Sequence, residues 1–168
     1  MYIQGKILKP GDELKEAIDI RKKVFIEEYG IPYDKEFDDF DMLAIHAVAY
    51  ERDDAAKKAD REDKKIAVAT GRIIFDGENY KIDKVAVLKE YRNKKYGDFI
   101  VRLLLNKAFI SGINEVDADA FASSEGFFKK IGFIRVSDEF LENGIKKYKM
   151  TISSKNLLKN CRKNNYLL

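Results

Sequence analysis

The chain has 168 residues, 45% of them hydrophobic and 36% charged, with a formal net charge of +3 and one cysteine. This length suits one domain of about 150 residues around one core, and the composition excludes a collagen-like, disordered or disulfide-stapled protein. No apolar run approaches the roughly 20 residues that span a bilayer and the first residues do not resemble a secretion signal, so we expect a cytoplasmic protein with no membrane partner.

The first predicted helix follows a Pro-Gly turn at residues 10–11. Asp12 is its expected cap, and apolar residues recur at helical spacing from Leu14 to Phe25. The segment 28–41 contains a glycine, a proline and paired acids, which favours a loop with at most one short helix.

The apolar period then changes to two, which predicts strands at 44–50 and 66–75. We expect the mixed-charge connection from Glu51 to Lys65 to be solvated and mobile. The dipeptide Asp76-Gly77 is a hairpin signal, so 66–75 and 80–88 should pair as antiparallel neighbours.

The second half of the chain alternates helical and extended patterns. A helix is predicted from Gly97 to Gly112, and a strand at 115–121. Ser123 or Ser124 is the expected cap of a shorter helix, which Gly132 should end. The last predicted strand pair is 133–136 with 145–152.

The tail after Ser153 is basic and carries apolar residues at helical spacing. Because its four cations account for most of the pI of 8.7, the rest of the chain offers little to nucleic acid, and we expect no nucleic-acid partner. No repeat or second boundary is visible. Residues 1–152 are therefore predicted to form a single domain, followed by the basic tail 153–168.

The predicted strand, turn and helix from Tyr80 to Ile110 favour an anion-binding site at the turn. A helix start leaves backbone N–H groups free, and Arg92, Lys94 and Lys95 add positive charge there. The turn has neither a Walker sequence nor a dinucleotide fingerprint. On these grounds alone, a phosphate site and an ordinary basic turn both stay open.

Residues 82–97 read Ile-Asp-Lys-Val-Ala-Val-Leu-Lys-Glu-Tyr-Arg-Asn-Lys-Lys-Tyr-Gly, which resembles the acyl-coenzyme-A signature of the GNAT N-acetyltransferases, Arg/Gln-x-x-Gly-x-Gly/Ala after a Val-Ala-Val strand. Residues 21–46 resemble the opening of a bacterial small-molecule-type subgroup, and 127–133 resemble the late Phe-Tyr-x-Lys-Leu-Gly-Phe motif. The resemblance covers most of the chain. It implies an α/β fold, with a mixed, largely antiparallel sheet of six or seven strands flanked by about four helices.

The resemblance also implies a function: transfer of an acetyl group from acetyl-CoA to a primary amine, by direct attack in a ternary complex and without a metal. The pantetheine arm would lie along 85–87, which would splay from 115–121, with the pyrophosphate on the amides of 93–98 and an oxyanion near the Val87 N–H. The implied coenzyme-binding residues are Val85, Ala86, Val87, Arg92, Asn93, Lys94, Lys95, Tyr96, Gly97, Asp98 and Phe128.

Two residues depart from the family pattern. Lys95 stands where the family usually has a glycine, so either the backbone approaches the pyrophosphate less closely or the lysine contributes charge in exchange. Phe128 stands where many members carry a tyrosine that protonates the leaving thiolate, and phenylalanine has no such proton. An acyl-CoA-binding module with weak or no catalysis is therefore the alternative.

An amine with a pKa near ~10 needs a base to attack at neutral pH. The candidate catalytic residues are Asp83, Glu28, Glu36 and His46 as bases and Tyr148 or Tyr96 as proton donors. Strand alternation would put Asp83 on the same face as Val85. A solvated or paired carboxylate and a hydrogen-bonded structural histidine are the alternatives.

Seven acids oppose one lysine between residues 27 and 41, where the resemblance places the acceptor side: Glu27, Glu28, Asp34, Glu36, Asp38, Asp39 and Asp41. Such a segment attracts cations, so we expect a positively charged small-molecule amine, with a solvated acidic loop as the alternative. The closing strand 145–152 and the apolar tail offer a surface to a second copy, which leaves a homodimer and a monomer both open.

Overall fold

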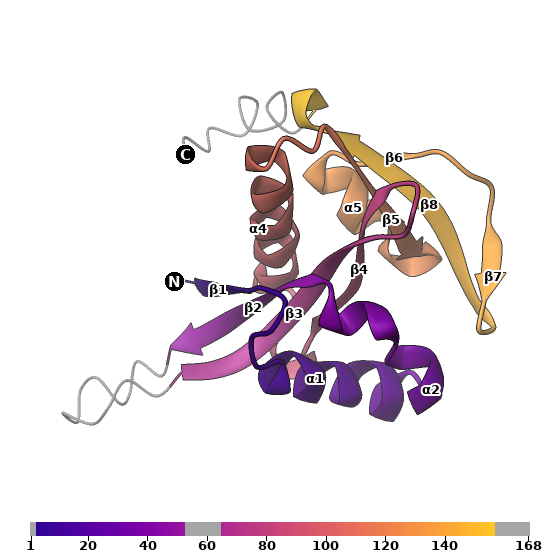
Figure 1. Ribbon diagram of the computed structural model, residues 1–168. Coiled ribbons are helices and arrows are strands. Elements are labelled where there is room, and N and C mark those ends of the chain that lie inside the picture. The colour runs from indigo at the N-terminus through magenta and orange to yellow at the C-terminus, as the bar shows by residue number, and fades with distance from the viewer. Residues whose placement is uncertain (1–2, 53–64, 157–168) are drawn as a thin grey trace. The chain divides into compact units, whose positions relative to one another are not determined.

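The computed structural model describes residues 3–52 and 65–156 (Figure 1). It divides into unit 1, Met1–Arg72 with Lys84–Leu104, and unit 2, Ile73–Asp83 with Leu105–Leu168. Three elements run through both units: β3 (Lys65–Phe75), β4 (Tyr80–Val87) and α4 (Tyr96–Ile110). Most of the expected mobile connection, 53–64, and most of the expected tail helix, 157–168, lie outside the described residues.

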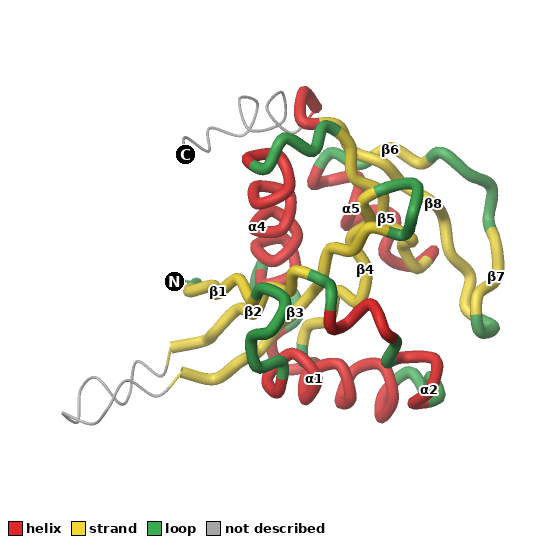
Figure 2. Tube along the Cα trace, viewed as in Figure 1, coloured by secondary structure: helices red, strands yellow, loops and turns green. Residues whose placement is uncertain are grey.

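Unit 1 contains one side of the sheet. The edge strand β1 (Gln4–Leu8) pairs antiparallel with β2 (Ile45–Arg52), and β3 and β4 follow in that order, as the yellow segments of Figure 2 show. The middle of β3 is continuously buried from Val68 to Ile74, which indicates that both of its faces are covered.

The helix α4 covers one face of these strands. A Cβ atom built on Gly71 of β3 would lie 2.9 Å from Cγ2 of Ile100 and 3.3 Å from Cδ1 of Leu104, both in α4. Because successive strand residues point to opposite faces, the next residue, Arg72, points to the other face. That face holds the helical segment that precedes β2.

This helical segment begins with α1 (Lys15–Arg21), continues as the π-helix η1 (Lys22–Glu28), and ends with α2 (Tyr33–Glu36) and the 3-10 helix η2 (Asp39–Met42). The predicted first helix is confirmed. Its predicted cap is wrong: Oδ2 of Asp12 accepts the N–H of Lys9 at 2.8 Å and closes the turn at 10–11, so it is not available to the helix. Leu14 occupies the cap position without a side-chain hydrogen bond.

Unit 2 is built around β5 (Glu115–Phe121) and β8 (Ile145–Ser153), which pair antiparallel. On its other side β5 pairs parallel with β4, with Lys81 opposite Asp117 and Ile82 opposite Ala118. The short strands β6 (Ile134–Arg135) and β7 (Phe140–Glu142) also pair with β8. Partners within the chain thus flank β8 on both edges, and this strand offers less to a second copy than its sequence indicates.

Unit 2 also contains the short helices η4 (Ala122–Ser124) and α5 (Glu125–Ile131). Ser124 holds the N-cap position of α5 without a side-chain hydrogen bond, and Gly132 ends the helix at φ +125°, a conformation that glycine adopts readily. The predicted boundaries of this helix are confirmed, but the predicted serine cap is wrong, because Ser124 makes no side-chain hydrogen bond to the helix.

The α/β class with a mixed, largely antiparallel sheet is confirmed, with eight strands rather than six or seven because Phe140–Glu142 adds a short one. The hairpin is also confirmed, since Asp76 donates its N–H to the carbonyl of Asn79 and Gly77 has φ +102°. Among the residues that the structure describes, no helix is long and apolar enough to cross a membrane.

Candidate active site

The turn before α4 has a backbone suited to an anion. After β4 the chain forms the 3-10 helix η3 (Lys89–Tyr91), and Asn93 and Lys95 then adopt left-handed conformations with φ +62° and +67°. The first intrahelical bond of α4 runs from the N–H of Phe99 to the carbonyl of Lys95 at 3.0 Å, so the amides of 96–98 have no acceptor within the helix. Turn amides in such an arrangement form a concave donor surface.

Lys95 stands at the glycine position of the motif and has the left-handed conformation that a glycine would adopt without strain. A residue with a side chain in this conformation costs about 1–2 kcal/mol, which glycine would not. The backbone of the loop therefore has the conformation that glycine favours at this position, and the residue there is a lysine. The neighbouring Lys94 places Nζ 5.0 Å from the ring centre of Tyr91.

Arg92 is held between two parts of unit 1. Its Nε donates to the carbonyl of Val87 at 3.1 Å, and Nη1 and Nη2 donate to the two carboxylate oxygens of Glu28 at 2.6 and 2.5 Å. These hydrogen bonds from Arg92 lower the pKa of Glu28 below its ordinary value. The candidate base Glu28 is therefore ionised and paired with Arg92. Its carboxylate in turn balances the charge of the Arg92 guanidinium.

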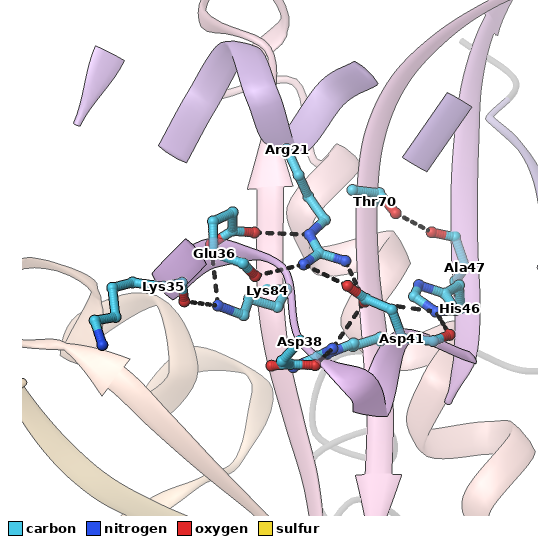
Figure 3. Close-up of polar contacts among 10 residues, drawn as sticks. Arg21, Lys35, Glu36, Asp38, Asp41, His46, Ala47, Thr70 and Lys84 are labelled. Carbon is cyan, nitrogen blue, oxygen red and sulfur yellow. Dashed lines mark hydrogen bonds and ion pairs between the residues drawn. The ribbon is translucent and has the colours of Figure 1, made fainter. Parts of the chain in front are cut away.

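A buried network lies on the face of the strands opposite α4 (Figure 3). Arg21, at the end of α1, donates from Nε to Oε1 of Glu36 at 2.7 Å and from Nη2 to the Glu36 carbonyl at 2.8 Å. Its Nη1 donates to Oδ1 of Asp41 at 2.5 Å. The side chains of Arg21 and Glu36 are each only 1% exposed, so water contributes little to their solvation.

Two more cations complete the network. Arg72 of β3 donates from Nη1 to Oδ1 of Asp41 at 2.7 Å, and from Nη1 and Nη2 to the two oxygens of Asp38 at 2.6 and 2.8 Å. Lys84 of β4 donates from Nζ to Oε2 of Glu36 at 3.0 Å. Three cations thus meet three carboxylates.

Burial alone would disfavour the charged forms of Asp38 and Asp41. The hydrogen bonds and charges of Arg72 and Arg21 outweigh this, and the pKa of each carboxyl lies below its ordinary value. With Glu28, four of the seven acids in the 27–41 segment are therefore held by arginines or Lys84, and a fifth, Asp34, lies 3.9 Å from Lys35 in an exposed pair. The field that this segment presents to an acceptor is weaker than its composition predicts.

Sequence reasoning missed this network because the arginines lie outside the acidic segment. The available signal was the presence of a charged residue in an apolar pattern: Arg21 lies on the apolar stripe of the first helix, and Arg72 lies within an apolar strand. A charge at such a position requires a buried partner.

His46 is buried and hydrogen-bonded to the backbone. Its Nε2 donates to the carbonyl of Asp41 at 3.0 Å, and its side chain is 1% exposed, which favours the alternative of a structural histidine. Burial lowers the pKa of His46 below its ordinary value, even though the Asp41 carbonyl and carboxylate favour the charged form.

This histidine predicts a pH dependence of stability. A histidine whose folded pKa is depressed contributes stability above its unfolded pKa of about 6.5, which is lost as pH falls through the folded value. His46 is the only histidine. We therefore expect the free energy of unfolding in urea to fall between pH 7 and pH 5, and to fall less in His46→Gln. Equal slopes in the two proteins would contradict this.

The candidates in unit 2 are placed as follows. Tyr148 of β8 donates its hydroxyl to Glu139 at 3.3 Å, and the guanidinium carbon of Arg135 lies 4.4 Å from its ring centre. Phe128 is buried and packs edge-on against its neighbours Phe127 and Phe133.

The other two candidates have different surroundings. Asp83 is half-buried on β4, where the left-handed Lys84 (φ +50°) interrupts strand alternation, so its shared face with Val85 no longer follows from strand geometry. Tyr96, in unit 1, is buried and packs edge-on against Tyr91, 6.1 Å between ring centres. The structure therefore brings together Glu28 with Arg92, and Glu36 with His46 through Arg21 and Asp41, while Asp83 and Tyr148 stay predictions.

Comparison with known proteins gives a consistent result. The family described as "Acetyltransferase (GNAT) domain" matches residues 41–154. A Bacillus subtilis protein named as an acetyltransferase is 32% identical over 142 residues, covering 83% of this chain and 88% of its own.

Two solved structures share the fold. A crystal structure of an N-acetyltransferase from Lactobacillus plantarum superposes with a TM-score of 0.76 at 20% identity, covering 90% of this chain and 97% of its own. An acyl-CoA N-acyltransferase from Pseudomonas aeruginosa superposes with a TM-score of 0.74 at 20% identity, covering 90% of this chain and 100% of its own.

Proposed function

Because the chain belongs to the GNAT acetyltransferase family and is an acyltransferase, we propose that it moves an acetyl group from acetyl-CoA to a primary amine. The observation that carries the choice of donor is the anion-binding backbone before α4, which directly follows the strand containing Val85–Val87. A nucleotide-tailed thioester needs both a phosphate site and an extended strand edge, and we assign these roles to the turn before α4 and to Val85–Val87 of β4, which follow one another in unit 1.

The residues of unit 1 would share the binding of this donor. The amides from Asn93 to Asp98 would hold the pyrophosphate, with Lys95 adding charge at the loop. The pantetheine arm would lie along Val85 and Ala86, and the N–H near Val87 would meet the carbonyl oxygen. Arg92 would stabilise the loop through its hydrogen bonds to the Val87 carbonyl and the Glu28 carboxylate.

The transfer proceeds in one complex without a covalent enzyme intermediate. The amine lone pair attacks the thioester carbonyl carbon, the new N–C bond forms, and the carbonyl oxygen becomes an oxyanion. Collapse of this intermediate breaks the C–S bond and releases the thiolate, while the ammonium proton passes to water or to a carboxylate such as Asp83. Phe128 offers no proton, so the thiol leaves as the thiolate and is protonated afterwards by water.

We propose a cationic amine as the acceptor. Three exposed acids of the acidic segment, Glu27, Asp34 and Asp39, support this proposal, since the other four are held by arginines and by Lys84. Of these three, Asp34 lies 3.9 Å from Nζ of Lys35, and both of those side chains are exposed. Three carboxylates still attract a cation and repel an anion, although less strongly than seven would.

A binding module with weak or no catalysis is the second candidate, favoured by Phe128 and its tight aromatic packing. Calorimetry with acetyl-CoA and a thiol-release assay with a panel of amines separate the two. Heat on titration with turnover of polyamines or lysine-like amines supports the enzyme. Binding without turnover of any amine supports the module, and preference for phosphorylated sugars overturns the cationic acceptor.

A further inference from the structure

We propose that two ion pairs, Glu28 with Arg92 and Glu36 with Lys84, position the acceptor segment 28–44 against the strand residues 85–87 and thereby set the affinity for the amine. This inference rests on the proposed function. It assigns the two candidate bases, Glu28 and Glu36, to positioning rather than to proton transfer.

The first pair reaches one end of the strand stretch. Glu28 is the last residue of the π-helix η1, and its carboxylate accepts two parallel hydrogen bonds from Arg92. The same guanidinium donates Nε to the carbonyl of Val87 at 3.1 Å. The start of the acceptor segment is therefore joined, through one rigid fork, to the end of β4.

The second pair reaches the other end. Lys84 immediately precedes Val85, and its Nζ donates to Oε2 of Glu36 at 3.0 Å and to the carbonyl of Lys35 at 3.5 Å. Glu36 ends α2 and is anchored in turn by Arg21. The left-handed backbone of Lys84 makes the strand irregular at this point.

The two pairs contact β4 at either end of residues 85–87. Their acidic members, Glu28 and Glu36, lie eight positions apart in the acceptor segment. Isolated surface ion pairs contribute little, but these two differ from such pairs. The first is bidentate, with each side chain 32% exposed, and the second joins a lysine that is 18% exposed to a fully buried carboxylate. Both pairs are charge-assisted hydrogen bonds, and the two parallel bonds of the first also fix its geometry.

The contacts also argue against proton transfer by these acids. Glu28 has a lowered pKa because Arg92 donates to it, so it binds a proton weakly at neutral pH. Glu36 is 1% exposed and both of its carboxylate oxygens accept from cations, which leaves no path to an amine. Positioning residues of this kind change the binding of the acceptor more than the chemical step.

The test measures steady-state kinetics and coenzyme affinity in Glu28→Gln and Lys84→Met. We expect the KM for the best amine to rise about tenfold in each, with kcat and the Kd for acetyl-CoA changed less than about threefold. Lys84→Arg, which keeps a donor for Glu36, should recover most of the affinity. The matched controls are Glu90→Gln and Lys89→Met, which change the same charges at exposed positions nearby and should leave KM unchanged.

Two kinetic outcomes would overturn the proposal. A fall in kcat with unchanged KM would show that these side chains act in the chemical step. Tighter acetyl-CoA binding by Glu28→Gln, with unchanged KM, would show that Glu28 competes with the coenzyme phosphates for Arg92.

Hydrogen–deuterium exchange separates this inference from the proposed function. Peptides covering 29–44 should exchange faster in both variants than in the unaltered protein and the controls, whether or not an amine is turned over. If the unaltered protein acetylates no amine, the proposed function fails. If exchange in 29–44 is the same in all the proteins, the positioning proposal fails independently.

Discussion

Replacing Arg21 with methionine is expected to lower the free energy of unfolding by about 3–5 kcal/mol, the usual cost of removing one partner from a buried ion pair. Arg21 makes two hydrogen bonds to Glu36 and two to Asp41, and its guanidinium carbon also lies 4.8 Å from the ring centre of Phe37. Methionine restores the apolar volume but leaves the buried carboxylate of Glu36 with Lys84 alone.

Urea denaturation at pH 7 measures this change. Lys23→Met, at an exposed position in the same helical segment, is the matched control and should differ from the unaltered protein by less than about 0.5 kcal/mol. Arg21→Lys retains the charge but not the fork, and should lie between the two. A loss below about 1 kcal/mol in Arg21→Met would mean that desolvation cancels the network's attraction.

The Arg21 variant should also respond differently to acid. In the unaltered protein the lowered pKa values of Asp38 and Asp41 add stability at neutral pH, which is lost as pH falls through the folded values, below about 4. Without Arg21 the pKa of Asp41 rises toward its ordinary value. The stability difference between the two proteins should therefore shrink as pH is lowered.

The second large effect is expected at Gly71, where Gly71→Ala should lower the free energy of unfolding by about 1–3 kcal/mol through overpacking. The added methyl group would meet Cγ2 of Ile100 at 2.9 Å, and Cδ1 of Leu104 and Cγ2 of Val85 at 3.3 Å each. Ile100 and Leu104 of α4 are fully buried and Val85 of β4 is half-buried, so the side chains of α4 have little room to move.

Gly126→Ala is the opposite control. Gly126 lies in α5 with no heavy atom within 4 Å of an added Cβ, so alanine should raise stability by up to about 1 kcal/mol through helix propensity. Urea denaturation of both variants checks the two signs together. A stable Gly71→Ala protein would show that α4 can move away from the strands. Because Val85 lies in the proposed acyl-transfer strand, the Kd for acetyl-CoA should be measured as well.

Much of the fold could be predicted because its signals are local. The hairpin at Asp76-Gly77, the strand at 115–121 and the stop at Gly132 each depend on neighbouring residues, and all three were found where the pattern predicted them. The loop before α4 was also located from its charges and from the motif around it. The role predicted for Asp12 was wrong because an aspartate carboxylate accepts a nearby backbone N–H both in a turn and at a helix cap.

The sequence patterns, read alone, established an α/β chain, the order of its helices and strands, and the resemblance that led to its family, since periodicity, turn chemistry and motif spacing are properties of neighbouring residues. They did not establish which charges meet. Arg92 pairs with Glu28 across 64 positions and Arg72 with Asp41 across 31, and only the packing of α1, η1 and η2 on the sheet brings these groups together. Seven acids that looked like an open anionic surface thus became, in part, the buried counterions of distant arginines and a lysine, because buried charges require partners wherever the chain supplies them.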